Sequence, residues 1–165
     1  MKDSIPVPPG SNTNKAAEPS PQTPSPQAGQ GQTGMEEYLD DFLTEFAQTL
    51  DSMKAALDKL EINPEDKAEL YTLYRNAHNM KGGARAMGFI RLGEFFRRIE
   101  LSLAPFRDNG KPLPEILTKA IRLAWASLHT APETIKKLRS DSALDFGPAS
   151  QKLESATNHY IRKPD

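Results

Sequence analysis

The sequence predicts an all-α protein: an up-down four-helix bundle with a short C-terminal helix and a disordered N-terminal tail. From residue 35 onwards, apolar residues recur at spacings of three and four, which is the period of a helix with one buried face. No stretch alternates between apolar and polar residues as a half-buried strand would. Short turn signals separate the helical segments, as expected for antiparallel neighbours in a bundle.

Composition limits both the size and the class of the protein. The 165 residues leave room for one domain and a tail, and they include no cysteine, which excludes disulfides and thiol chemistry. The net charge of -1 argues against general binding to nucleic acid or to a membrane surface. No apolar run approaches the length of a membrane span, and prolines interrupt the first residues, where a signal peptide needs an apolar core. We therefore expect a cytoplasmic protein that contacts neither nucleic acid nor membrane.

The segment 1–34 differs in composition from the rest of the chain. It holds seven of the 14 prolines and no aromatic residue, so it cannot bury enough apolar surface to offset its ordering entropy. We expect a disordered tail that acts as a tether, the alternative being a short binding motif. The bundle is then expected over 35–139, and a C-terminal helical appendage and tail over 140–165.

The first expected helix begins near Met35 and carries a continuous apolar seam. The seam residues step by four and three over about two dozen positions, as in a coiled coil. A coiled-coil dimer is one interpretation of this pattern. We favour one helix of an intramolecular bundle, hence a monomer, because similar stripes follow at once. The seam consists of Leu39, Leu43, Phe46, Leu50, Met53, Leu57 and Leu60.

Turn and cap signals divide the remaining chain into helices. Asn63 is a suitable N-cap and Pro64 suits the first helical turn, so a second helix is expected from there to about Met87. Gly88 is the usual left-handed residue after a helix end. A third helix should follow, to about Arg107.

Three further signals shape the C-terminal half. The turn residues Asp108, Asn109 and Gly110 precede prolines that reopen a helix at 112–114. Pro132 should kink or split that fourth helix. A last amphipathic segment, from Ser142 to Tyr160, is expected to pack as a short terminal helix.

The second helix carries the candidate site. Its apolar stripe places His78 about 130° from the stripe centre, at about 100° per residue, so the imidazole faces solvent. Gly82 leaves no side chain one turn after the imidazole, so a partner can approach the ring closely. Lys81 adds a flexible cation suited to a phosphate oxygen. The residues that share the face of His78 are Tyr74, Lys81, Gly82 and Arg85.

A hairpin about Gly88 would bring Glu100 beside His78. His78 lies ten residues before Gly88 and Glu100 twelve after it, which at 1.5 Å per residue puts them about 15 and 18 Å from the turn. A carboxylate at that level can accept the Nδ1 proton, which fixes the tautomer and leaves Nε2 as an outward-facing nucleophile.

These residues resemble the histidine-containing phosphotransfer (HPt) domain family. The pattern His-x-x-Lys-Gly-(x)5-Gly stands at His78, Lys81, Gly82 and Gly88, and the resemblance extends over roughly Leu39 to Leu138. It looks most like the phosphotransfer domain of chemotaxis-type histidine kinases, where a glutamate at the position of Glu100 hydrogen-bonds the phospho-accepting histidine. Arg97 departs from well-known chemotaxis members, which carry a second histidine there. Further motif residues are Gly83, Ala84, Phe89 and Leu92.

The resemblance implies a carrier rather than an enzyme. His78 would accept a phosphoryl group from a histidine kinase or a phosphorylated receiver and pass it to a receiver-domain aspartate, with magnesium and most catalytic groups belonging to the receiver. We expect no cofactor and no ATP site, because no nucleotide-binding glycine loop is present. Tyr74, Gly82 and Arg85 are the candidate partner interface.

Other readings of the sequence compete with this one. The same surface would also suit a binding module that sequesters a kinase or receiver without transferring phosphate, and the long first seam would suit a structural dimer. Neither His129 nor His159 has comparable neighbours, and no second His or Cys follows at three or four residues to form a metal site. We therefore expect no bound metal.

Overall fold

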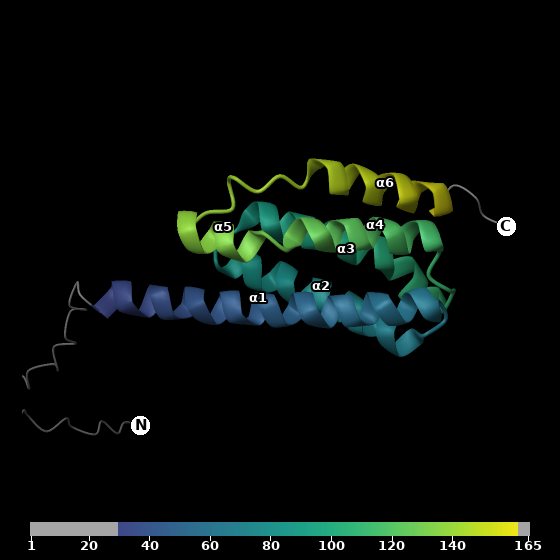
Figure 1. Ribbon diagram of the computed structural model, residues 1–165, viewed down its shortest axis with the longest axis horizontal. Helices are drawn as coiled ribbons and strands as arrows, with labels where there is room; N and C mark the ends of the chain where they lie inside the picture. Colours follow the sequence, from purple (N-terminus) through teal and green to yellow (C-terminus); the bar gives the residue numbers. More distant parts are fainter. Residues whose placement is uncertain (1–29, 162–165) are drawn as a thin grey trace, which may run out of the picture.

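The computed structural model describes residues 30–161, and these contain α-helices and connecting turns but no strand. The first four helices pack in a ring in which α1 contacts α2, α2 contacts α3, and α4 contacts both α3 and α1. The short α5 packs on α1 and α4, and α6 lies against α3 and α4 on the outside of the ring (Figure 1). The all-α bundle with a short C-terminal helix is thus confirmed. The helices are α1 (Gln30–Ile62), α2 (Lys67–Ala86), α3 (Ile90–Asn109), α4 (Glu115–Leu128), α5 (Ala131–Leu138) and α6 (Gly147–Ile161).

The apolar seam of α1 faces the core of its own chain. Every seam residue from Leu39 to Leu60 is at most 9% exposed, and two pairs of aromatic rings join α1 to the hairpin that follows. Phe42 lies 5.5 Å from Phe89, and Phe46 lies 5.8 Å from Phe96, measured between ring centroids. The intramolecular interpretation of the seam is therefore correct.

Two helix starts differ from the sequence-based expectation. Helix α1 begins at Gln30, so residues 30–34 are helical rather than part of the tail. Residues 1–29, on which the rest of the disorder prediction falls, lie outside the described residues. The N-cap of α2 is Asp66, not Asn63, because the Asp66 carboxylate accepts the amide protons of Ala68 and Glu69 at 3.1 Å each. Asn63 instead caps a turn by accepting the Glu65 amide.

The link between α2 and α3 is a tight glycine turn. Gly88 has φ +80°, which side chains other than glycine rarely adopt. The amides of Gly88 and Phe89 donate to the carbonyls of Arg85 and Ala84 at 3.0 and 2.8 Å, which is the Schellman pattern. Gly88 therefore ends α2 as the sequence predicts and turns the chain straight into the antiparallel α3.

The C-terminal segment is part of the same core. Pro132 splits the predicted fourth helix into α4 and α5, and the last helix begins at Gly147, five residues later than expected. Phe146, just before α6, stacks on Phe95 of α3 with ring centroids 4.2 Å apart. The buried Asp141 caps the start of α3 by accepting the Leu92 amide at 3.0 Å.

None of the helices that the structure describes has an apolar stretch long enough to cross a membrane.

Candidate functional site

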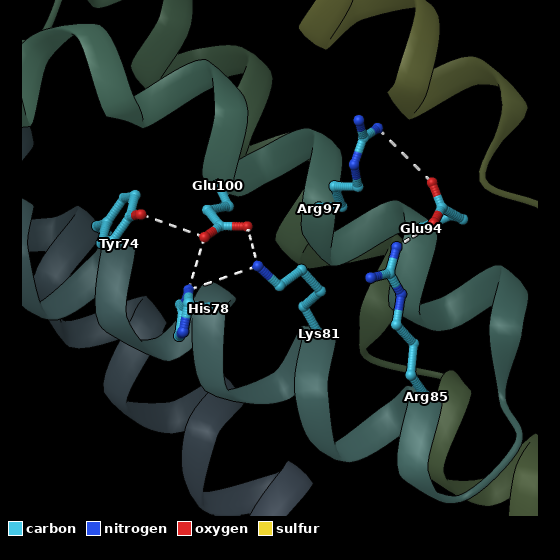
Figure 2. Close-up of polar contacts among 7 residues, drawn as sticks. All are labelled: Tyr74, His78, Lys81, Arg85, Glu94, Arg97 and Glu100. Atoms are coloured by element: carbon cyan, nitrogen blue, oxygen red, sulfur yellow. Dashed lines mark hydrogen bonds and ion pairs between the residues drawn. The ribbon is translucent and has the colours of Figure 1, made fainter.

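His78 and Glu100 meet across the α2–α3 hairpin. The Nδ1 atom of His78 lies 2.7 Å from Oε1 of Glu100, as Figure 2 shows. The His78 side chain is 55% exposed, whereas that of Glu100 is 9% exposed. The hairpin register inferred from Gly88 thus brings together the two residues that the sequence predicts.

Glu100 is a charged group held in a mostly buried place by three donors. Besides His78, the Lys81 ammonium donates to Oε2 at 2.7 Å and the Tyr74 hydroxyl donates to Oε1 at 3.2 Å. Burial alone raises the pKa of Glu100, but the hydrogen bonds from Lys81, His78 and Tyr74, with the Lys81 charge, outweigh it and hold the pKa below its ordinary value. Glu100 is therefore an anion aimed at the imidazole.

This geometry selects one tautomer of His78. A carboxylate only accepts hydrogen bonds, so Nδ1 carries the proton and donates it to Glu100. The Lys81 Nζ atom, 3.4 Å from Nδ1, cannot donate to a nitrogen that already bears a proton. The Lys81 ammonium thus donates to Glu100 in this arrangement. In the neutral imidazole, Nε2 then has a free lone pair on the side of the ring away from Glu100 (Figure 2).

The two glycines after His78 lie in different surroundings. A Cβ atom built at Gly82 would meet nothing within 4 Å, so packing within the chain does not require glycine there. At Gly83 the same atom would lie 3.5 Å from the Phe42 ring, an ordinary contact. Gly82 therefore leaves open space one turn from the imidazole, as predicted, while Gly83 faces the bundle.

Arg85 is not a free cation. Its guanidinium forms an ion pair with Glu94 of α3, and Arg97 reaches the second oxygen of the same carboxylate at 3.7 Å. The Arg85 stem passes directly over Gly93. An interface role for Arg85 would thus need the ion pair with Glu94 to open.

Sequence reasoning missed three contributors to this site. The Tyr74 hydroxyl, Glu94 and Gly93 gave no motif signal. The hairpin register about Gly88, applied to Arg85, would have pointed to Glu94 on the facing helix. The roles of the Tyr74 hydroxyl and of Gly93 can be recognised only once the side-chain directions are known.

The remaining histidines have different neighbours. His129 lies edge-on to Trp125 at 5.6 Å between ring centroids, and His159 is exposed on α6. Within residues 30–161, no three His, Cys, Asp or Glu side chains are grouped so as to hold a metal ion.

Comparison with known proteins places this hairpin in a family. A chemotaxis protein CheA from Halobacterium salinarum is 32% identical over 76 residues, which cover 46% of this chain and 11% of that protein, so the chain spans about a tenth of its relative. The phosphorylated P1 domain of CheA3, solved in complex with CheY6 from R. sphaeroides, has the same fold with a TM-score of 0.69 at 22% identity. The match covers 74% of this chain and 97% of that domain. The Hpt domain family model matches residues 37–131, which is more than half of the chain. This chain therefore belongs to the Hpt family of histidine-containing phosphotransfer domains.

Proposed function

We propose that this protein is a phosphorelay intermediate that carries a phosphoryl group on Nε2 of His78. The observation behind the proposal is the 2.7 Å contact between the His78 Nδ1 and Glu100, made by an imidazole whose side chain is 55% exposed. A histidine that is merely solvated gains nothing from a buried carboxylate at Nδ1. A nucleophilic histidine gains a fixed tautomer from that carboxylate.

The transfer step uses the free lone pair of Nε2. Nε2 attacks the phosphorus of the donor, a nitrogen–phosphorus bond forms, and the bond from phosphorus to the leaving oxygen of the donor breaks. The ring gains positive charge, which the Glu100 carboxylate stabilises through the Nδ1 proton. In the return step a receiver aspartate oxygen attacks the same phosphorus and Nε2 leaves with its lone pair.

Lys81 has to change partner to take part in this step. Its ammonium now contacts Glu100, on the Nδ1 side of the ring, whereas the phosphoryl group would sit on Nε2. The side chain is 20% exposed on a flexible four-carbon stem, so the ammonium can turn outward to a phosphate oxygen. We expect Lys81 to neutralise phosphoryl charge after that movement.

The partners follow from the same chemistry. The donor is a histidine kinase or a phosphorylated receiver domain, and the acceptor is a receiver-domain aspartate. The similar domain crystallised with CheY6 supports a receiver as partner. Magnesium and most catalytic groups would be supplied by the partner, so the chain acts as a carrier rather than an enzyme. We expect this carrier to be a cytoplasmic monomer. Gly82 and the faces of Tyr74 and Arg85 would lie at the docking surface.

Replacing His78 by glutamine tests the proposal directly. We expect His78→Gln to fold, because Lys81 and Tyr74 still donate to Glu100, and to accept no label from radiolabelled kinases or receivers. His129→Gln, at another exposed histidine, is the matched control and should be labelled like the wild type. Acid-labile, base-stable label on His78→Gln would refute the assignment. A sequestering module would bind receivers and never transfer label to them.

A further inference from the structure

Tyr74 lies one helical turn before His78 and shares its carboxylate. The Tyr74 hydroxyl donates to Oε1 of Glu100 at 3.2 Å, and this is the oxygen that accepts the Nδ1 proton of His78 at 2.7 Å. The tyrosine ring is half-buried and lies 6.2 Å from the imidazole, nearly parallel to it. The hydroxyl is therefore directed at Glu100 rather than outward (Figure 2).

The Tyr74 ring is itself fixed by α3. The guanidinium of Arg107 lies 3.9 Å from the ring centroid, a cation–π arrangement. Asp108 holds that guanidinium through a hydrogen bond of 2.6 Å to its Nε atom. The position of the hydroxyl thus depends on the last turn of α3 and not only on the rotamer of Tyr74.

The contribution of the Tyr74 hydroxyl to holding Glu100 in place depends on the proposed movement of Lys81. A carboxylate can rotate about its last side-chain bond, and three donors now oppose that rotation. When Lys81 turns to the phosphoryl group, the ammonium leaves Oε2. Among the contacts described, Tyr74 is then the only donor besides His78 that keeps Oε1 at Nδ1.

We infer that Tyr74 is a positioning residue of the phosphotransfer reaction. Its hydroxyl holds Glu100 against Nδ1 and so maintains the tautomer with a free lone pair on Nε2, also after Lys81 has moved. The inference rests on the proposed function and deepens it. It assigns to the Tyr74 hydroxyl a role inside the site, which is separate from the proposed place of the ring face at the docking surface.

Tyr74→Phe removes only the hydroxyl and keeps the ring against Arg107. We expect phosphorylation of His78 by phosphoramidate, which needs no partner protein, to slow by about threefold to tenfold, the range set by one hydrogen bond. In this reaction the phosphorus–nitrogen bond of the donor breaks, ammonia leaves, and the bond to Nε2 forms. The matched control is Tyr71→Phe: Tyr71 is 55% exposed on the same helix, and its hydroxyl bonds to none of the described residues. It should react at the wild-type rate.

Nitrogen NMR of the His78 ring in alkaline solution supplies a readout that a purely structural role would not change. In Tyr74→Phe we expect the population protonated on Nδ1 to fall and that protonated on Nε2 to rise. The thermal transition should stay cooperative, with the small decrease in melting temperature that the loss of one hydrogen bond causes. An unchanged tautomer ratio and an unchanged rate would overturn the inference. So would a loss of rate seen only with a partner protein, which would make the hydroxyl a docking contact.

A double-mutant cycle tests whether Tyr74 acts through Glu100. In a Glu100→Ala background the hydroxyl has nothing to hold, so adding Tyr74→Phe should cause no further loss. An equal loss in both backgrounds would refute the coupling. Failure of the proposed function itself would look different: wild-type His78 would take no label, while the tautomer comparison in the free protein would still test the link from Tyr74 to Glu100.

Discussion

The chemistry of the site depends on one carboxylate. The Glu100 side chain is only 9% exposed, and a charge so nearly buried is tolerated only where both oxygens have donors. Its donors are the imidazole that we propose as the nucleophile, the cation that we propose to move and a tyrosine hydroxyl, namely His78, Lys81 and Tyr74. The three differ in mobility, so the carboxylate can release Lys81 and keep the other two.

The lowered pKa of Glu100 predicts a specific acid sensitivity. Because the pKa is lower in the folded state than in the unfolded chain, ionised Glu100 stabilises the fold above its ordinary pKa of 4.5, and this contribution is lost as pH falls through the folded value. We expect the free energy of unfolding, measured with urea from neutral to acid pH, to fall more steeply for wild type than for Glu100→Gln. The other paired carboxylates are common to both proteins and cancel in the comparison. Parallel curves would mean that Glu100 is not stabilised by its donors.

Gly82 offers a test that separates access from packing. A leucine at this position meets open space within the chain and relieves the roughly 1 kcal/mol cost of glycine in a helix, so Gly82→Leu should melt higher. It should also block transfer from kinases and to receivers, because the side chain covers the approach to the imidazole. Gly83→Ala is the matched control. It brings a similar gain in helix propensity, but its side chain faces Phe42 rather than the imidazole, so we expect normal transfer. Normal transfer by Gly82→Leu would contradict the access argument.

At this scale the sequence predicts the pair but not its surroundings. His78 and Glu100 follow from helix period and hairpin register alone, since both are properties of the backbone. The contact of the Tyr74 hydroxyl with Glu100 does not follow, because the rotamer of a long side chain depends on its neighbours on the facing helix. Periodicity places such a residue on a face without telling which group it contacts.

Between elements, two glycines set how α2 and α3 meet. Gly88 turns the chain through a left-handed residue, and Gly93 allows the close approach of the two helices. A Cβ atom at Gly93 would lie 2.7 Å from Cγ of Arg85 and 3.4 Å from the carbonyl oxygen of Lys81. The first contact is too short and involves the base of a side chain rather than its flexible end.

Gly93→Ala should therefore destabilise the protein although alanine favours helices. We expect a loss of about 1 to 3 kcal/mol in the free energy of unfolding, typical of an overpacked contact, together with slower phosphorylation of His78 as the hairpin opens. Urea denaturation and the phosphoramidate reaction would measure the two effects. Gly82→Ala, in open space on α2, is the control and should gain stability. A gain for Gly93→Ala as well would show that Arg85 moves aside at little cost.

The ends of elements were harder to predict than their existence. Asp66 replaces Asn63 as the cap of α2 because two amides converge on its carboxylate, and both residue types cap helices equally well. The cap of α3 comes from Asp141, 49 residues away along the chain from Leu92. A local sequence pattern cannot predict a contact between residues so far apart in the chain.

Over the whole molecule, the bundle and the C-terminal segment share one core. Leu144, Phe146 and Leu153 are each at most 7% exposed and belong to the same cluster of buried residues as the helices of the ring. The spacing of these residues indicates a buried face, but it does not tell which groove receives that face. A domain boundary at residue 139 stays a prediction. Because the segments on its two sides share one core, we expect them to fold as one cooperative unit.

Shortening the chain to residues 1–139 decides the question. The truncation removes the ring stacked on Phe95 and the carboxylate that caps Leu92. Loss of one buried Phe side chain alone costs about 3 to 5 kcal/mol, against a total stability of about 5 to 15 kcal/mol for a domain. We expect the truncated chain to lose its cooperative thermal transition and Phe146→Ala in the full chain to keep it at a lower temperature. Gln151→Ala, at an exposed position of α6, is the control for the point variant and should melt close to the wild type. A truncated chain that melts as sharply and as high as the full one would show that 35–139 folds alone, and α6 would then be an appendage as the sequence suggests.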